Sequence, residues 1–274
     1  MAVEGVELSG TYAVQPPANA GHFLRITGQQ DGRNFCFHSK LTPVGATHGT
    51  EPYQSLLPLE QAVQVWLDQP IGELAYPISP EGKLDAALYG SQVAALFNQV
   101  QLAETGADFS CTSLGNDPVG LASPVTMRGV TAAYLFANTL VVLEVTEEVL
   151  RQTLERCAAY FTLVDGQPQI SEEFLLPKVE HYNYDFYAGL AYTFDLRRPV
   201  GSRVVRLTKL DGSPLENGKF RLCTSNYRAT GTGGYDALRK CPVLWRGGVE
   251  MPDLTARYIQ THSPVPQLHN AEMR

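Results

Sequence analysis

The chain has 274 residues, of which 44% are hydrophobic and 18% charged, so it has ample material for a buried core. Its formal net charge of −7 argues against binding to nucleic-acid duplexes, because counterion release needs a clustered positive surface. No apolar run approaches the roughly 18 residues of a membrane-spanning helix, so we expect no membrane span. The first ten residues lack the basic and apolar segments of a signal peptide.

The N-terminal part of the chain alternates short apolar runs with turns. Residues 1–55 predict two or three strands, and QDGR at 30–33 predicts a hairpin turn between two of them. The stretch ATHGTEPYQSLLP at 46–58 is typical of a linker. We therefore expect a domain boundary between residues 57 and 58.

Helical and strand patterns follow this linker. LEQAVQVWLDQ predicts a short helix at 59–69, and QPIGELAYPIS predicts a strand at 69–79. A second helix is expected at 84–104, where apolar side chains recur at i, i+3, i+4 and i+7 from Val93. These elements alternate too irregularly for a repeated β-α-β fold.

The second half begins with the strongest pattern in the chain. TLVVLEV at 139–145 is a continuous apolar run that predicts a buried strand. Thr146 is placed to cap a helix over the following residues, and Glu147 and Glu148 complement its positive end. Further strands are expected at 190–196, 203–210 and 219–225, and a short helix at 235–240. The mixture predicts an α+β fold with a mixed sheet and flanking helices.

Motifs for hydrolytic or metal chemistry are missing from the sequence. The six histidines are dispersed, and neither H-E-x-x-H nor G-x-S-x-G occurs. The five cysteines form no C-x-x-C pair, so we expect small buried hydrophobic residues at Cys36, Cys111, Cys157, Cys223 and Cys241. We predict no catalytic and no metal-binding residue within the chain.

The glycine-rich loop SNYRATGTGGYD at 225–236 raises the question of a phosphate site. Gly231 and Gly233 fit the start of a dinucleotide fingerprint, but Asp236 stands where the third small residue belongs. A carboxylate there would also repel a pyrophosphate. We expect the loop to present its own aromatic residue instead, because glycine permits positive φ and close approach to the backbone.

Two loops place an aromatic residue beside an amide. AYLFANTLVV has Phe136 and Asn138 ahead of a predicted strand, and TSNYRATGTGG has Asn226 and Tyr227 after another. Two rings facing each other would sandwich a nucleobase, with a stacking contribution of about 1–3 kcal/mol per contact. An aromatic residue at a strand start also commonly packs in the core, so both interpretations stay open.

The same stretches carry a family resemblance. LFANTLVVLEVTEEVLRQTLE, HYNYDFYAGLAYTFDLRRPVGSRVVRL and TSNYRATGTGGYDAL resemble the C-terminal domain of the bacterial nucleotidases. This family contains 5′-nucleotidases, UDP-sugar hydrolases and 2′,3′-cyclic-nucleotide 2′-phosphodiesterase/3′-nucleotidases. The resemblance covers about residues 58–260, and residues 7–45 resemble the closing strands of the preceding metallophosphoesterase domain. It implies terminal strands and a linker over 1–57 and a nucleotide-binding C-terminal domain over 58–274.

The resemblance also implies a substrate site. The family stacks the base between two aromatic residues, which correspond to Phe136 and Tyr227 here, and a further signature covers Asn183 and Asp185. Turn and strand-end hydrogen bonding is the alternative interpretation of this pair. The expected substrate-binding residues are Phe136, Asn138, Asn183, Asp185, Asn226, Tyr227, Gly231 and Gly233.

At two places the sequence differs from the pattern of 5′-nucleotidases, and these differences indicate the branch of the family that it resembles most. The stretch CTSLGNDPVGLASP at 111–124 lacks the glycine run and the phosphate-binding arginine of 5′-nucleotidases, and Gly233 replaces their substrate-binding aspartate. The sequences NTLVV and NYRA are closer to the cyclic-phosphodiesterase/3′-nucleotidase branch.

By resemblance, the whole protein would be a hydrolase of nucleotide catabolism in the periplasm, the cell wall or the extracellular space. A pair of divalent metals (Mn, Zn or Mg) would sit in its own N-terminal metallophosphoesterase domain, so this chain alone is expected to be inactive. The alternatives are a 5′-nucleotidase or UDP-sugar hydrolase domain, a stand-alone nucleoside-binding module, and a degenerate homologue whose aromatics only pack the core.

Overall fold

The computed structural model describes residues 3–18, 20–45, 51–216 and 218–268. Its contacts divide the chain into two compact units, Met1–Ala62 and Val63–Arg274. Helix α1 (Glu51–Asp68) runs through the division and contains Pro58. The predicted linker at 46–58 is therefore helical from Glu51 on, while 46–50 lie outside the described residues. Good helix formers around Pro58 outweigh the one backbone hydrogen bond that proline removes.

Ahead of α1, the described residues of the N-terminal unit form two antiparallel hairpins, which gives four strands where two or three were expected. They are β1 (Val3–Leu8) with β2 (Thr11–Gln15), and β3 (His22–Asp31) with β4 (Asn34–Pro43). The predicted hairpin turn at 30–33 is confirmed, because Asp31 pairs with Asn34 around Gly32, whose φ is +61°. Ile26, Phe35 and Phe37 lie on one face of the longer hairpin and are exposed within this unit.

The second unit is built around a five-stranded sheet in the order β11-β6-β14-β8-β15. Its strands are β6 (Phe109–Ser113), β8 (Thr139–Val145), β11 (Asp185–Ala188), β14 (Phe220–Ser225) and β15 (Val243–Glu250). Strand β14 pairs in parallel with β6, and every other pair in this sheet is antiparallel. The predicted mixed sheet of an α+β fold is thus confirmed.

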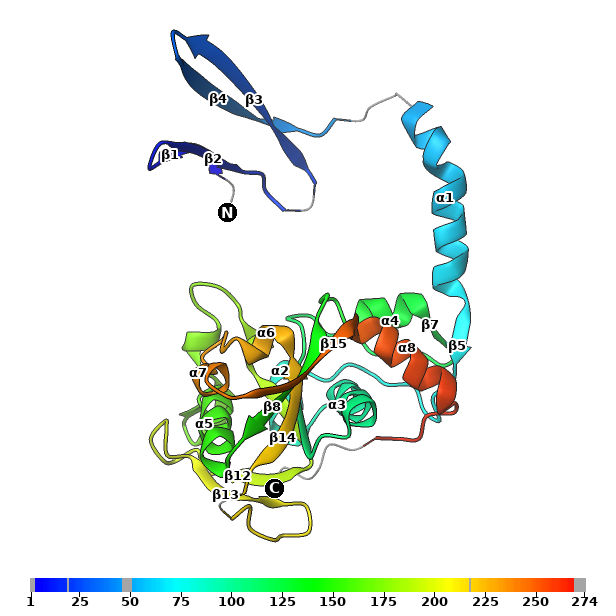
Figure 1. Ribbon diagram of the computed structural model, residues 1–274, viewed down its shortest axis with the longest axis vertical. Helices are drawn as coiled ribbons and strands as arrows, with labels where there is room; N and C mark the ends of the chain where they lie inside the picture. Colours follow the sequence, from blue (N-terminus) through cyan, green and yellow to red (C-terminus); the bar gives the residue numbers. More distant parts are fainter. Residues whose placement is uncertain (1–2, 19, 46–50, 217, 269–274) are drawn as a thin grey trace. The chain divides into compact units, whose positions relative to one another are not determined.

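Helices cover both faces of this sheet. Helix α3 (Gln92–Thr105) packs against β6 and β11, and against α8 (Met251–Thr261). Helix α5 (Glu147–Ala158) lies on the other side of β8 and β14 (Figure 1). Strand β8 is buried from Leu140 to Leu143 because both faces are covered, as its continuous apolar run predicts. Thr146 Oγ1 accepts from the Val149 backbone N–H, which confirms the predicted cap of α5.

The remaining elements are short. The strand pairs are β5 (Pro70–Gly72) with β7 (Val125–Thr126), β9 (Phe161–Val164) with β10 (Gln167–Ile170), and β12 (Leu190–Phe194) with β13 (Val204–Lys209). The helices are α2 (Lys83–Tyr89), α4 (Met127–Ala133), α6 (Asn226–Ala229) and α7 (Asp236–Arg239), with single 3₁₀ turns η1 (Glu172–Phe174) and η2 (His181–Asn183).

Two predicted elements differ from the structure. The helix expected at 84–104 is broken into α2 and α3, because Gly90 has a φ of +93° and Ser91 Oγ caps the new helix at Ala94. The strand expected at 69–79 is regular only over Pro70–Gly72, with single bridges further along the chain. Prolines and a glycine in that stretch leave too few paired backbone groups for a longer strand.

The cysteine expectation is correct for most positions. Cys111, Cys157 and Cys223 are buried and Cys241 is half-buried, but Cys36 is exposed on β4. Burial raises the pKa of Cys157 and of Cys223 to about 12. The three buried thiols therefore stay protonated at neutral pH and act as small core side chains.

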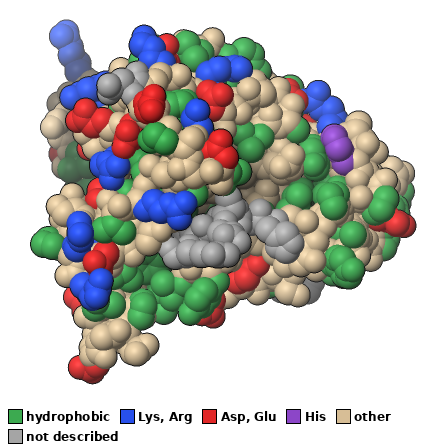
Figure 2. Space-filling model, turned by 90° about the horizontal axis from the view of Figure 1, so that it is seen from below, with side chains coloured by type: hydrophobic (Ala, Val, Ile, Leu, Met, Phe, Trp, Pro, Cys, Tyr) green, Lys and Arg blue, Asp and Glu red, His purple; other side chains and the backbone are tan. Residues whose placement is uncertain are grey.

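Charged side chains of both signs share the surface (Figure 2). Lys and Arg side chains are interspersed with Asp and Glu on the face shown in Figure 2. None of the helices described is long and apolar enough to cross a bilayer. Within the described residues, no group of three or more His, Cys, Asp or Glu side chains is arranged to hold a metal ion.

Candidate functional site

The sheet topology brings four loops to the same end of the sheet, where β6 and β14 end and β8 and β11 begin. Strand β8 starts where the antiparallel β14 ends, since Leu140 pairs with Ser225. Strand β6 runs parallel to β14, so its last residue, Ser113, lies at the same end of the sheet. Ser113 in turn pairs with Asp185 at the start of β11, which brings the segment before β11 to this end of the sheet as well. The two predicted aromatic loops therefore meet here, together with two others.

A cavity of about 250 Å³ lies among these loops. It is lined by Ser113, Phe136, Asn138, Lys178, Tyr182 and Tyr227. The side chain of Phe136 is 40% exposed and that of Tyr227 is 41% exposed, so neither ring is part of the packed interior. The structure thus places three of the predicted site residues in one cavity and adds three that the sequence analysis missed.

The two predicted asparagines occupy different positions around this cavity. Asn226 joins the two aromatic loops, because its Oδ1 accepts from the backbone N–H of Thr139 at 3.3 Å and of Tyr227 at 3.0 Å. Asn138 lines the cavity and donates from Nδ2 to Tyr134 Oη at 3.3 Å. Asn226 is not among the described lining residues, so its geometry supports a role in holding the loops together.

The glycines after Tyr227 adopt the positive φ that the sequence predicts, +84° at Gly231 and +82° at Gly233. A side chain at Gly233 would collide with the protein itself. Its Cβ would lie 2.2 Å from Asn183 Oδ1 and 2.5 Å from Arg228 Nη1. Glycine is therefore required at this position because the side chains of Asn183 and Arg228 pack directly against the backbone of Gly233.

Arg228 is the centre of the loop assembly. It is 2% exposed, and its Nε and Nη2 donate to Asp185 Oδ1 at 3.1 and 2.8 Å. Nη2 also donates to the Tyr182 carbonyl at 2.8 Å, and Nη1 donates to the Thr232 carbonyl at 2.6 Å. The guanidinium carbon lies 4.1 Å from the centre of the Tyr235 ring. One buried cation therefore joins its own loop, up to Tyr235, to the segment 182–185, which lies more than 40 residues earlier in the sequence.

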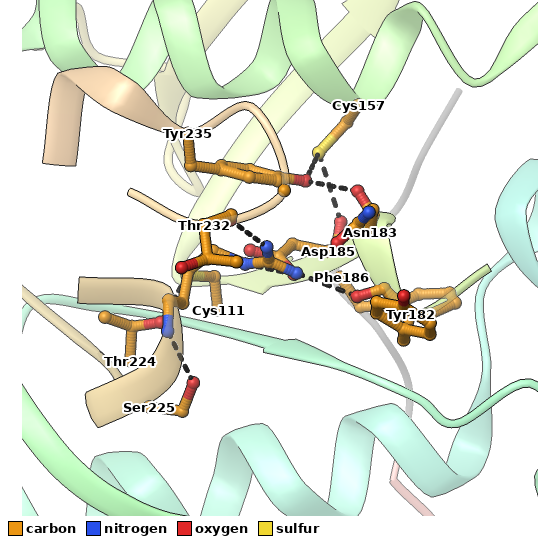
Figure 3. A network of polar contacts seen from close by, with 12 residues as sticks. Cys111, Cys157, Tyr182, Asn183, Asp185, Phe186, Thr224, Ser225, Thr232 and Tyr235 are labelled. Carbon is orange, nitrogen blue, oxygen red and sulfur yellow. Dashed lines mark hydrogen bonds and ion pairs between the residues drawn. The ribbon is translucent and has the colours of Figure 1, made fainter. Parts of the chain in front are cut away.

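The polar groups around this cation are tightly interlinked (Figure 3). Tyr235 Oη donates to the Asn183 carbonyl at 3.0 Å and lies 3.2 Å from Cys157 Sγ. Burial lowers the pKa of Arg228, but the charge of Asp185, its hydrogen bond and the neighbouring Tyr235 and Cys111 together raise the pKa above its usual value. Arg228 therefore remains charged in the interior, paired as buried ions must be.

Asn183 and Asp185, which the sequence places in the site, lie in this network. Asn183 is 4% exposed and donates from Nδ2 to Glu180 Oε2 at 2.9 Å. Asp185 is 1% exposed and forms the ion pair with Arg228. Neither is among the described residues that line the cavity, so the strand-end interpretation explains the contacts that they make.

Lys178 and Tyr182 form a polar side of the cavity. Lys178 Nζ donates to Tyr182 Oη at 2.9 Å and lies 5.2 Å from the centre of its ring. Tyr182 Oη donates to Glu180 Oε1 at 3.1 Å. The hydrogen bond with Tyr182 raises the pKa of Lys178. Tyr182 is adjacent to the predicted Asn183 and could have been found from that motif, whereas Lys178 belongs to no recognisable pattern.

A second polar contact lies on the same segment. His181 Nδ1 is 2.7 Å from Oη of the buried Tyr160. Burial lowers the pKa of His181, the nearby Lys83 lowers it further, and Asp117 opposes the shift. The folded chain therefore favours the neutral form of His181, within hydrogen-bond distance of Tyr160.

The described geometry can be compared with known proteins. Residues 75–240 match the protein family described as 5′-nucleotidase, C-terminal domain. The chain belongs to this family. The match confirms the resemblance inferred from the sequence motifs, and it includes the whole cavity and the Arg228 network.

Two curated relatives of this 5′-nucleotidase C-terminal domain come from bacteria, and one of them is a nucleotidase by name. The chain is 28% identical over 212 residues to the 2′,3′-cyclic-nucleotide 2′-phosphodiesterase/3′-nucleotidase of Haemophilus influenzae, covering 64% of this chain and 32% of that protein. It is 26% identical over 218 residues to Protein UshA of Yersinia enterocolitica, covering 77% of this chain and 34% of that protein.

A solved structure matches nearly the full length. The crystal structure of a proposed 5′-nucleotidase from Staphylococcus aureus superposes with a TM-score of 0.78 at 28% identity, covering 98% of this chain and 54% of that chain. The chain thus spans about a third of the length of the two curated relatives and about half of the solved one.

Proposed function

We propose that this 5′-nucleotidase C-terminal domain holds the base of a nucleotide or nucleoside between the rings of Phe136 and Tyr227. The observation that carries the proposal is that both rings are about two-fifths exposed and line the same cavity. Exposed aromatic rings that face a shared space are available for stacking, which contributes about 1–3 kcal/mol per contact. A homologue that used these rings only for core packing would bury them.

The size of the cavity favours a flat ring over a complete nucleotide. Its volume of about 250 Å³ is slightly below the roughly 300–1,000 Å³ of pockets that enclose a drug-sized ligand. A base would fill it, and the ribose and phosphate would extend outward. Such a site positions a substrate for chemistry that is carried out by groups elsewhere in the protein.

The reaction we favour is that of the 2′,3′-cyclic-nucleotide 2′-phosphodiesterase/3′-nucleotidases. A relative of that name is 28% identical to this chain. The stretch 111–124 contains no arginine, whereas the 5′-nucleotidases use one there to hold phosphate. A 5′-nucleotidase or a UDP-sugar hydrolase is the alternative within the family.

We place the catalytic metals outside this chain. The sequence lacks the D-x-H and G-N-H-E clusters of a di-metal site, and the described residues offer no group of three metal-binding side chains. A pair of divalent cations (Mn, Zn or Mg) in an N-terminal metallophosphoesterase domain would activate the attacking water. The exposed Ile26, Phe35 and Phe37 on one face of the β3–β4 hairpin support such a domain, because they are apolar side chains that need a covering surface.

The family resemblance also supports a location outside the cytoplasm, in the periplasm, the cell wall or the extracellular space, and a role in nucleotide catabolism. The reading frame upstream of residue 1 tests both the location and the domain assignment. We expect it to encode a secretion signal and the D-x-H and G-N-H-E clusters of a di-metal site. A start codon with no coding sequence before it would favour the stand-alone nucleoside-binding module instead.

Calorimetric titration with adenosine tests the clamp directly. We expect the double variant Phe136→Ala/Tyr227→Ala to lose measurable binding, since both stacking faces are removed. Tyr89→Ala, which removes an exposed tyrosine at the end of α2, is the matched control and should bind like wild type. Equal affinity of wild type and the double variant would refute the clamp.

Hydrolysis assays test the division of labour. Purified chain with added Mn²⁺ should not turn over 2′,3′-cyclic AMP or 3′-AMP, because the proposed metal site belongs to another domain. Turnover that scales with protein concentration and survives repeated purification would contradict this assignment.

A further inference from the structure

Lys178 is the one charged side chain among the described residues that line the cavity. The other five contribute aromatic rings, hydroxyl groups and an amide. An ammonium group has three N–H donors and no acceptor. The cavity therefore has one charged hydrogen-bond donor in its wall.

The position of this donor is set by a chain of contacts. Lys178 Nζ donates to Tyr182 Oη at 2.9 Å and lies 5.2 Å from the centre of that ring. The backbone of Tyr182 is held in turn, because its carbonyl accepts from the buried Arg228 at 2.8 Å. Tyr182 Oη also donates to Glu180 Oε1 at 3.1 Å, which fixes its own orientation. Tyr182 takes one N–H of Lys178 and leaves the others for a ligand.

We propose that Lys178 makes this site prefer 6-oxopurines, such as hypoxanthine and guanine, over the 6-aminopurine adenine. The inference rests on the proposed clamp between Phe136 and Tyr227. A 6-oxopurine presents a carbonyl oxygen that accepts from the ammonium group. Adenine presents an amino group at the same position, so two donors would face each other and the ammonium would lose a water without gaining an acceptor.

Inosine and adenosine are the matched ligands for this test, because they share the ribose and differ at position 6 and the adjacent ring nitrogen. We expect wild type to bind inosine about tenfold more tightly, which corresponds to the low end of a charge-assisted hydrogen bond at a solvent-accessible site. Lys178→Met keeps the apolar stem, and it should weaken inosine binding to the level of adenosine. Its adenosine affinity should stay within about twofold of wild type.

Two further variants control for charge and fold. Lys178→Arg retains a cationic donor, and we expect it to keep a preference for inosine. Lys209→Met removes another exposed lysine that lies over an aromatic ring, 5.9 Å from the centre of Phe220. Because Lys209 is not a described lining residue, this variant should keep the wild-type affinities for both nucleosides. Circular dichroism of each variant verifies that the fold is retained.

Several outcomes would overturn the inference. Equal binding of inosine and adenosine by wild type would do so, as would a Lys178→Met variant that weakens both nucleosides equally. If Lys178→Met weakens inosine 3′-phosphate but neither nucleoside, Lys178 contacts phosphate and the inference is wrong. In these cases nucleosides still bind and the clamp stands. If wild type binds neither nucleoside, the clamp fails and the preference fails with it.

Discussion

Replacing Arg228 by methionine tests whether the buried cation organises the site. The substitution keeps an unbranched side chain of similar length but removes all the donors. Four hydrogen bonds are lost, two to Asp185 and one each to the carbonyls of Tyr182 and Thr232. Asp185 is left 1% exposed without its counter-ion.

The expected cost follows from this burial. Removing one partner of a buried ion pair destabilises a protein by about 3–5 kcal/mol, mainly because the other charge is stranded. Typical domains are stable by only about 5–15 kcal/mol, so the substitution should remove a large share of the total. Replacing both partners with apolar residues is often close to neutral. Arg228→Met/Asp185→Leu should therefore recover about 2 kcal/mol or more relative to Arg228→Met.

Urea unfolding followed by far-UV circular dichroism measures these differences. Arg197→Met is the matched control, because Arg197 also pairs with an aspartate, Asp195 at 2.8 Å, but its side chain is 83% exposed. That control should show no measurable loss, as exposed pairs contribute little. If Arg228→Met cost less than about 1 kcal/mol, or no more than Arg197→Met, the assigned role of the buried pair would be wrong.

Two smaller perturbations probe the surroundings. Gly233→Ala should destabilise the chain more than Gly212→Ala, because both have φ above +80° but only at Gly233 would a Cβ clash, 2.2 Å from Asn183 Oδ1. Equal losses of unfolding free energy would refute the packing argument. Burial lowers the pKa of His181, so the unfolded chain binds its proton more readily and stability should fall as pH drops below about 7. His181→Gln keeps an acceptor for Tyr160 and should make the fall in Tm from about pH 7 to 5 shallower, and an unchanged slope would contradict this.

Much of the fold can be predicted where local pattern and tertiary context agree. Strand β8 is found at its predicted bounds, because a continuous apolar run can only be buried on both faces. Strand β6, FSCTS, was missed although it is almost wholly buried. Ser110 is satisfied by the helix that precedes the strand, because its Oγ donates to Asn98 Oδ1 at 2.6 Å. The serines and threonine of FSCTS give no apolar run or alternation, so the strand has no signal of its own in the sequence.

The residues of the site also divide into those with a local sequence pattern and those without one. Phe136 and Tyr227 could be singled out from the sequence because each stands near an asparagine at the end of a predicted strand. The pairing of β8 with β14 then brings them to one cavity. Lys178 and Ser113 could not. They reach the cavity through the pairing of β6 with β11, which joins segments that are distant in the chain and have no shared pattern.

Arg228 explains what the glycine-rich loop does. Tyr227 and Arg228 are consecutive residues of the single-turn helix α6, so their side chains diverge by about 100° around its axis. Tyr227 therefore lies on the exposed side of the helix, while Arg228 is buried on another side. The loop then turns back through Gly231 and Gly233, both at positive φ, so that the Thr232 carbonyl meets the guanidinium. The glycines are therefore needed to enclose a cation of the protein itself, and the enclosed cation holds Tyr227 at the cavity.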